Sequence, residues 1–403
     1  MAGTLHPDVD SAEAVEIGKE IGRLAAPYAA IHDLDGTFVA QGYDAVRKLN
    51  FGHLAVPQDL GGCGQGLEGM CRAQAAIARG CASTSLAIAM HSHAVLTMAW
   101  RRASGDDEAE AVLRRVVEEG IVLSASGTLM PSAISIDAEP VEGGYLLTGR
   151  RRLVSGAPGA DYVVSAARLH GSSGPRPITV LAPLHGEGVT ILDDWDALGM
   201  RGSGTNSVSF DRAFVPVKNA LYTEQRRPVT PPPAPAAADA RSDGGGGRPG
   251  GLQMPGLHIS LPIIGSVYLG LADAIFEKAV DMAAGTSRAD NPGAGHLTGV
   301  MVSEIRLGWW ALEGLVRQTT DASLGTRAQM VTTLVGKRQM VLSAIRTIEA
   351  AMELLGSATY LRGSAFERAL RDARAGITHP APPEATLVEV GWGALDEVAT
   401  TRP

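Results

Sequence analysis

The sequence is poor in aromatic residues and has no excess of positive charge. Phe, Trp and Tyr make up 4% of its 403 residues, so Ala, Leu, Val and Ile must form most of any core. The chain has 35 basic and 43 acidic residues, which gives a formal net charge of -8 at pH 7. Because no surplus of Lys and Arg is available to displace phosphate counterions, we exclude nucleic acid as a partner.

Cysteines and long apolar segments are also scarce. The three cysteines, Cys63, Cys71 and Cys81, are an odd number at spacings that match no zinc site. The first twenty residues lack the basic and apolar regions of a secretory signal. Of the most apolar stretches, Ser85–Trp100 is interrupted by histidines, and Leu261–Ala274 is too short to cross a bilayer. These absences predict a soluble cytoplasmic protein with reduced thiols and no membrane contact.

The pattern of apolar residues changes along the chain. A chain of this length also predicts two or three structural units that share a core. Residues 1–120 have helical periodicity, and residues 121–225 hold short strands separated by Gly and Pro turns. Residues 226–251 are rich in Pro, Ala and Gly, which predicts a mobile linker. Residues 252–403 are helical again. The fold class is therefore α+β, with an antiparallel β domain between two helical domains.

Apolar periodicity also places individual helices. We predict helices over Ala12–Ala30, Leu67–Gly80, Ser83–Arg102, Asp106–Gly120, Met301–Thr320 and Met330–Leu355. Ser260 is an N-cap candidate for the first C-terminal helix, with Pro262 in its first turn. Asp33 and Asp35 follow the first helix and are interpreted as loop residues.

Several motifs have a structural and a functional interpretation. The run Gly64–Gly69 matches G-x-G-x-x-G, but the region that should hold a strand and a ribose-binding acid is helical, so we interpret the run as a tight turn. His91 and His93 lie two apart on a helix and cannot bind one ion. One of them belongs to the core or to solvent, and we retain His93 as a pocket residue. The three arginines at 150–152 are interpreted as a solvated strand edge.

Four segments, taken in order, resemble the acyl-CoA dehydrogenase superfamily. The resemblance spans nearly the whole chain. Its segments are Leu54–Pro57 with Leu60–Gly64, Gly144–Gly149 with Val154–Ala157, Leu198–Thr205 through Val215–Pro216, and Phe366–Arg368 with Arg371–Arg374.

This resemblance implies a helical N-terminal domain, a β-barrel-like middle domain and a C-terminal four-helix bundle, with FAD between the last two. Val154 and Ser155 would lie against the isoalloxazine ring, where a hydroxyl can hydrogen-bond to flavin N5. The other side of the ring would contact Ser124, Ser126 and Gly127. Gly356 and Ser357 would receive the ADP part of FAD from a neighbouring subunit, which implies a homodimer or homotetramer formed through the C-terminal helices.

The departures from the family pattern concern the catalytic base. Family dehydrogenases remove the proton α to a thioester with a glutamate, which must lie within hydrogen-bond reach. The usual position holds His379, and the alternative position, at the start of the first C-terminal helix, holds His258. A histidine at 379 is typical of the family's hydroxylase branch, which receives reduced flavin from a separate reductase. The catalytic candidates are therefore His379 and His93.

Three functions follow. The first, placed first because it is the commonest activity of the superfamily, is dehydrogenation of an acyl thioester with a relocated base and an electron-transfer partner. The second is oxygenation of a small molecule by reduced flavin, with a flavin reductase as partner. The third is a non-catalytic family member, against which Ser155 and the intact β-domain motif count.

Overall fold

The computed structural model describes residues 11–126, 134–170, 174–222, 255–284, 286, 291–321 and 327–401. The helices of these segments are α1 (Ala12–Asp35), α2 (Ala40–Lys48), α3 (Leu67–Gly80), α4 (Ala82–Ala103), α5 (Asp107–Glu118), α6 (Pro255–Ala284), α7 (Pro292–Asp321), α8 (Arg327–Leu355), α9 (Ala365–Arg374) and α10 (Pro383–Thr401). The strands are β1 (Leu123–Ala125), β2 (Ile136–Val141), β3 (Gly144–Val154), β4 (Tyr162–Leu169), β5 (Arg176–Pro183), β6 (Val189–Ile191), β7 (Asn206–Pro216) and β8 (Ala220–Tyr222).

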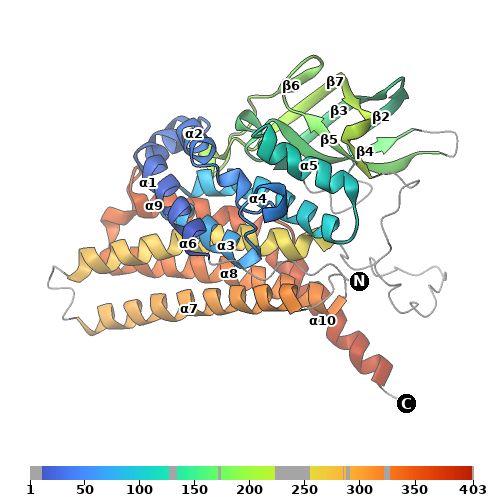
Figure 1. Ribbon diagram of the computed structural model, residues 1–403. Coiled ribbons are helices and arrows are strands. Elements are labelled where there is room, and N and C mark those ends of the chain that lie inside the picture. The colour runs from blue at the N-terminus through green and yellow to red at the C-terminus, as the bar shows by residue number, and fades with distance from the viewer. Residues whose placement is uncertain are drawn as a thin grey trace.

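The N-terminal helices lie between the sheet and the long C-terminal helices (Figure 1). Of these, α4 contacts both α6 and β1, so it connects the two larger parts of the molecule. Its start is fixed by Cys81, whose sulfur accepts from the Thr84 amide at 3.4 Å. Asp106 caps α5 by accepting from the Ala109 amide at 3.0 Å. Gly66 directly precedes α3, so the G-x-G-x-x-G run enters a helix.

The sheet has eight strands in the order β6-β7-β3-β2-β4-β5-β8, with β1 paired to β4. Most pairs are antiparallel, but β4 pairs in parallel with both β1 and β2. The predicted antiparallel pairing therefore holds for most of the sheet, but not where β4 pairs with β1 and β2. The reason is that the chain from β2 passes through β3 before it returns as β4 on the other side of β2. Closure of the sheet into a barrel remains a prediction.

Three long helices, α6, α7 and α8, run alongside one another in the C-terminal part, and α10 projects from their end (Figure 1). The prediction of Ser260 as N-cap was wrong, because α6 already begins at Pro255, and both Ser260 and Pro262 lie inside the helix. As a result, α6 is longer than predicted. It is long and apolar enough to cross a membrane, but 83% of its most apolar window is buried within the fold, as in a core helix.

Two further expectations change. Asp33 and Asp35 are not loop residues, since α1 continues to Asp35 and ends at Gly36 in the left-handed conformation. Asp33 is buried and forms an ion pair with Arg371 of α9 at 2.6 Å. The predicted linker 226–251 lies outside the described residues. The division into domains 1–120, 121–225 and 252–403 remains a prediction.

Candidate functional site

Ser155 lies directly after β3 at the end of a chain of buried hydroxyl groups. Ser203 and Thr205 are 2.7 Å apart, and Thr205 donates to the Ser155 hydroxyl at 3.0 Å. Each hydroxyl has one proton to donate. If Ser203 donates to Thr205 and Thr205 donates to Ser155, the proton of Ser155 is used in neither of these hydrogen bonds. No acceptor for that proton is recorded in the described part of the chain. Ser155 is thus a prearranged hydrogen-bond donor.

Ser124 and Ser126 hold the end of β1 against the end of β3. The Ser124 hydroxyl donates to the Ser155 carbonyl at 2.8 Å. Ser126 accepts from Arg151, which contacts both its hydroxyl and its carbonyl at 2.8 Å. The structure therefore brings Ser124, Ser126 and Ser155 together, and their contact with a flavin ring stays a prediction. Gly127 lies outside the described residues.

Arg151 does not lie on a solvated strand edge, and that prediction was wrong. Only 5% of its surface is exposed, and burial lowers the pKa of its guanidinium. No carboxylate pairs with it among the described residues. Arg150 and Arg152 are exposed, so the three residues follow the alternation of faces along β3, and Arg151 is the one that points inward.

Leu153 lies in the irregular part of β3, between Arg151 and Val154. Its φ is +58°, in the left-handed region that a leucine seldom adopts. Its side chain is 60% exposed, although Val154 beside it is fully buried. Strained, exposed apolar residues of this kind concentrate at binding sites. Leu153 therefore offers an apolar surface two residues before the Ser155 hydroxyl.

His379 lies beyond α9, with its ring against α6. Its Nδ1 is 3.1 Å from the hydroxyl of Tyr268, a residue that is fully buried. If Tyr268 accepted this bond, its own proton would have no recorded acceptor, so we assign Tyr268 as the donor. The Nε2 of His379 then carries the ring proton. Burial, aided by the charge of Lys337, lowers the pKa of His379 to about 3, so the ring is neutral at physiological pH.

Lys337 of α8 positions the segment that carries His379. Its ammonium donates to three carbonyl oxygens, those of Gly376 at 2.8 Å, His379 at 3.0 Å and Ala381 at 3.2 Å. Its side chain is 1% exposed, and burial lowers its pKa to about 8. Three acceptors match the three protons of an ammonium group, so the charge is fully hydrogen-bonded.

The two histidines of α4 differ. Fully buried His91 accepts from the Leu123 amide through Nδ1 at 3.0 Å, and its Nε2 lies 3.1 Å from the Gly52 carbonyl, to which it donates. His91 is therefore the core residue of the pair. His93 is partly exposed, and burial, followed by the charge of His91, lowers its pKa to about 4. The histidines do not share a ligand site, and no group of three metal-binding side chains occurs in the segments that the structure describes.

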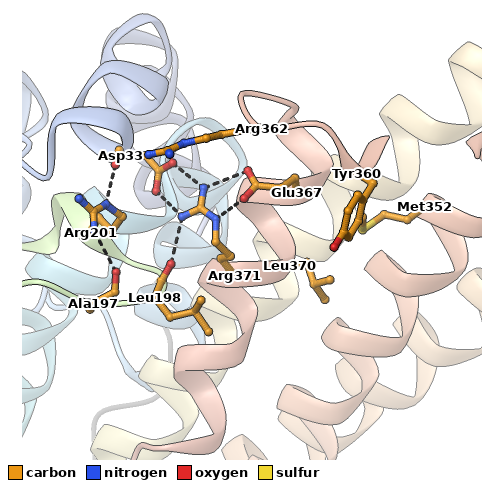
Figure 2. A pocket seen from close by; sticks show the side chains of 10 residues that line it. All are labelled: Asp33, Ala197, Leu198, Arg201, Met352, Tyr360, Arg362, Glu367, Leu370 and Arg371. Atoms are coloured by element: carbon orange, nitrogen blue, oxygen red, sulfur yellow. Dashed lines mark hydrogen bonds and ion pairs between the residues drawn. The ribbon is translucent and has the colours of Figure 1, made fainter. Parts of the chain in front are cut away.

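A cavity lies elsewhere, between the loop before β7 and the C-terminal helices (Figure 2). Its volume is about 560 Å³, and its lining residues include Leu198, Met352, Tyr360 and Arg362. Arg371 joins its walls by binding Asp33 and the Leu198 carbonyl.

Gly356 and Ser357 are exposed, at the turn where α8 ends and the short helix Ser357–Tyr360 begins. None of the predicted site residues lines the cavity. The resemblance assigns Gly356 and Ser357 to the cofactor of a neighbouring subunit. That role remains a prediction.

Comparison with known proteins agrees with this architecture. Residues 19–119 match the model of the acyl-CoA dehydrogenase N-terminal domain, and residues 262–382 match that of the C-terminal domain. The chain belongs to the acyl-CoA dehydrogenase superfamily. The matched segments contain α4 with His93 and the α6–α9 region with His379.

Among its superfamily relatives are enzymes that oxidise amino sugars. The chain is 29% identical to L-evernosamine nitrososynthase of a Micromonospora species over 88% of this chain and 83% of that protein. It is 28% identical to amino sugar nitrososynthase DnmZ of Streptomyces peucetius over 87% and 84%. The solved structure of KijD3 with FMN and dTDP-3-amino-2,3,6-trideoxy-4-keto-3-methyl-D-glucose has a TM-score of 0.81 and 27% identity, covering 98% of this chain and 97% of that one. These homologues support a flavin-dependent oxidoreductase.

Three functional candidates escaped the sequence analysis. Tyr268 lies in an apolar helical stripe, which predicts only a core residue. Its hydroxyl contacts His379, which is 111 residues away in the sequence. Lys337 lies on a long helix, where a lysine usually faces solvent. Arg151 is the middle one of three consecutive arginines, and alternation of faces along the strand could have identified it as the inward-facing one.

Proposed function

We propose that this protein is a two-component monooxygenase of the acyl-CoA dehydrogenase superfamily that oxygenates the amine nitrogen of a small molecule, of the amino-sugar class. The reaction is R–NH₂ + O₂ + 2e⁻ + 2H⁺ → R–NHOH + H₂O, with a separate reductase supplying the reduced flavin. The observation that carries the proposal is His379, a neutral histidine fixed by Tyr268 at the position where family dehydrogenases have their glutamate.

The residues around Ser155 fit a flavin. The unused proton of Ser155 suits an acceptor such as a flavin ring nitrogen, and Leu153 offers an apolar surface for the ring. Arg151 is a buried cation without a carboxylate partner in the described chain, so a negatively charged group nearby would compensate its charge. A reduced flavin bound there would supply the two electrons that oxygen requires. We leave FAD, the flavin implied by the resemblance, as a prediction, since KijD3 was solved with FMN.

His379 supplies the proton chemistry in this proposal. With Tyr268 bonded to Nδ1, the ring presents Nε2–H as a donor, which suits an oxygen atom that gains negative charge as the O–O bond breaks. Lys337 fixes the backbone on both sides of the ring, so the direction of the donor is defined. The same ring is a poor substitute for glutamate in dehydrogenation, because its Nδ1 accepts from Tyr268 and its Nε2 already carries a proton.

The experiment compares two reactions of the same preparation. Protein with chemically reduced FMN or FAD and oxygen is mixed with the dTDP-linked 3-amino sugar, and mass spectrometry follows the gain of one oxygen atom. In parallel, flavin-loaded protein is mixed anaerobically with a panel of acyl-CoA thioesters, and flavin absorbance is followed. We expect oxygen gain and no bleaching. Bleaching by a thioester without oxygen gain on the amine would establish the dehydrogenase that the sequence analysis placed first.

A further inference from the structure

His258 is a second histidine with a defined tautomer, and it has no role in the reaction described so far. It lies in the first turn of α6 with 1% of its surface exposed. Its Nδ1 is 2.8 Å from the hydroxyl oxygen of Thr333 on α8. Its other nitrogen, Nε2, is buried and has no hydrogen-bond partner among the residues that the structure describes.

The proton on the ring can be assigned from the neighbouring bond. Thr333 donates its single proton to the Gln329 carbonyl at 2.9 Å, one helical turn earlier. Thr333 can therefore only accept from His258, so Nδ1 carries the proton and Nε2 has a bare lone pair. Burial lowers the pKa of His258 to about 4, so the ring does not gain a second proton near neutral pH.

A buried acceptor without a donor is rare in a folded protein and calls for a partner from outside the chain. Open space lies in the same turn of α6, on the face opposite His258, because at Gly256 an added Cβ would meet nothing closer than the Thr97 hydroxyl oxygen at 4.0 Å. Thr97 lies one turn after His93 on α4. On the other side, Leu257 and Leu261 pack with Ala381, which follows His379 and is bound by Lys337.

We propose that His258 is a substrate-binding residue whose Nε2 lone pair accepts a hydrogen bond from an N–H or O–H of the bound substrate. His379 and His258 then present opposite tautomers, one a donor and the other an acceptor. An amine held by His258 through an N–H keeps its nitrogen lone pair directed away from the ring. The site would thus select substrates with a donor at this point over analogues that lack one. The substrate class rests on the proposed function, but the tautomer does not.

The tautomer is tested first, on flavin-loaded protein with ¹⁵N-labelled histidine. Comparison of the wild-type spectrum with that of His258→Leu identifies the ring, and we expect an unprotonated Nε2 at pH 7. A proton on Nε2 would overturn the proposal. Thr333→Val removes the acceptor for Nδ1 and should release the proton to either nitrogen. Thr332→Val, an exposed neighbour with the same bond to the carbonyl four residues earlier, should leave the spectrum unchanged.

Binding is tested with the dTDP-3-amino sugar and the analogue that has hydrogen in place of the amine. We expect wild type to favour the amine about tenfold and His258→Leu to lose this preference while its flavin affinity stays the same. Thr333→Val should reduce the preference if His258→Leu fails to fold. A preference retained in these variants would overturn the proposal. If neither nucleotide binds, the amino-sugar substrate of the proposed function is wrong, and the spectrum alone decides the state of Nε2.

Discussion

The phenolic oxygen of Tyr268 lies 3.1 Å from Nδ1 of His379, although 111 residues separate them in the chain. The contact joins the middle of α6 to the segment after α9. It fixes both the tautomer and the direction of a ring that would otherwise rotate about its side-chain bonds. Two variants follow from it, one for the ring and one for its support.

His379→Ala should leave flavin binding intact and reduce product formation by a factor of about 10² to 10⁴, the usual contribution of a positioned proton donor. Oxygen would still be consumed, and hydrogen peroxide would replace the product. Tyr268→Phe should cause a smaller loss in the same direction, because the ring remains but its tautomer is no longer fixed. The measurement is the ratio of product to oxygen consumed. Unchanged coupling in both variants would contradict the role given to His379.

Ser155→Ala tests the cluster of hydroxyl groups. The change removes one hydrogen bond to the flavin and should weaken binding by about 1 kcal/mol, or roughly fivefold. It should also shift the absorbance spectrum of the bound flavin. Ser135→Ala, which removes an exposed hydroxyl bound to the Arg150 carbonyl, is the matched control. Equal effects of the two substitutions would remove Ser155 from the flavin site.

Lys337→Met should destabilise the fold by about 2–4 kcal/mol, because three carbonyl oxygens lose a charged donor at once. Part of that loss is offset, since the burial of a charge is also removed. Coupling between oxygen use and product should fall as well, because His379 loses its backbone support. Urea denaturation measures the stability change. Lys278→Met, at an exposed position of α6, should change stability by less than about 0.5 kcal/mol.

The sequence is sufficient for the succession of helices, strands and helices along the chain, and its short motifs identify the family, while the roles of Ser124, Ser155 and His379 stay predictions. It does not reveal the groups that act through long-range contacts. The acceptors of Lys337 are main-chain carbonyls 39 to 44 residues away, and a carbonyl leaves no trace in the sequence. Alternation along β3 buries Arg151 between the exposed Arg150 and Arg152, but the sequence does not show which face of the strand is covered.

The helix boundaries show the same limit. Leu67–Gly80 was predicted as it occurs, since Gly66 and Cys81 mark both of its ends. The start of α6 was misplaced because Ser260 resembles a cap, whereas Pro255 provides an equally suitable first residue. Packing of the first turn of α6 against α8, which includes the contact between His258 and Thr333, favours the longer helix.

The last prediction concerns acid stability and His91. Burial lowers the pKa of His91 from 6.5 to about 4. Between these values the unfolded chain binds more protons than the folded one, so stability is fully present above pH 6.5 and falls as the pH approaches 4. Between pH 7 and pH 5, His91 alone should lower the free energy of unfolding by about 2 kcal/mol.

The variant His91→Gln tests this effect. Its side chain keeps a donor for the Gly52 carbonyl and an acceptor for the Leu123 amide but cannot titrate. Between pH 7 and pH 5 the variant should therefore lose about 2 kcal/mol less stability than the wild type. Urea midpoints at the two pH values measure the difference. His296→Gln, at an exposed position of α7, is the control and should retain the wild-type dependence. If His91→Gln also retains it, His91 does not remain neutral in the fold, and its assignment as an uncharged link between α4 and β1 is wrong.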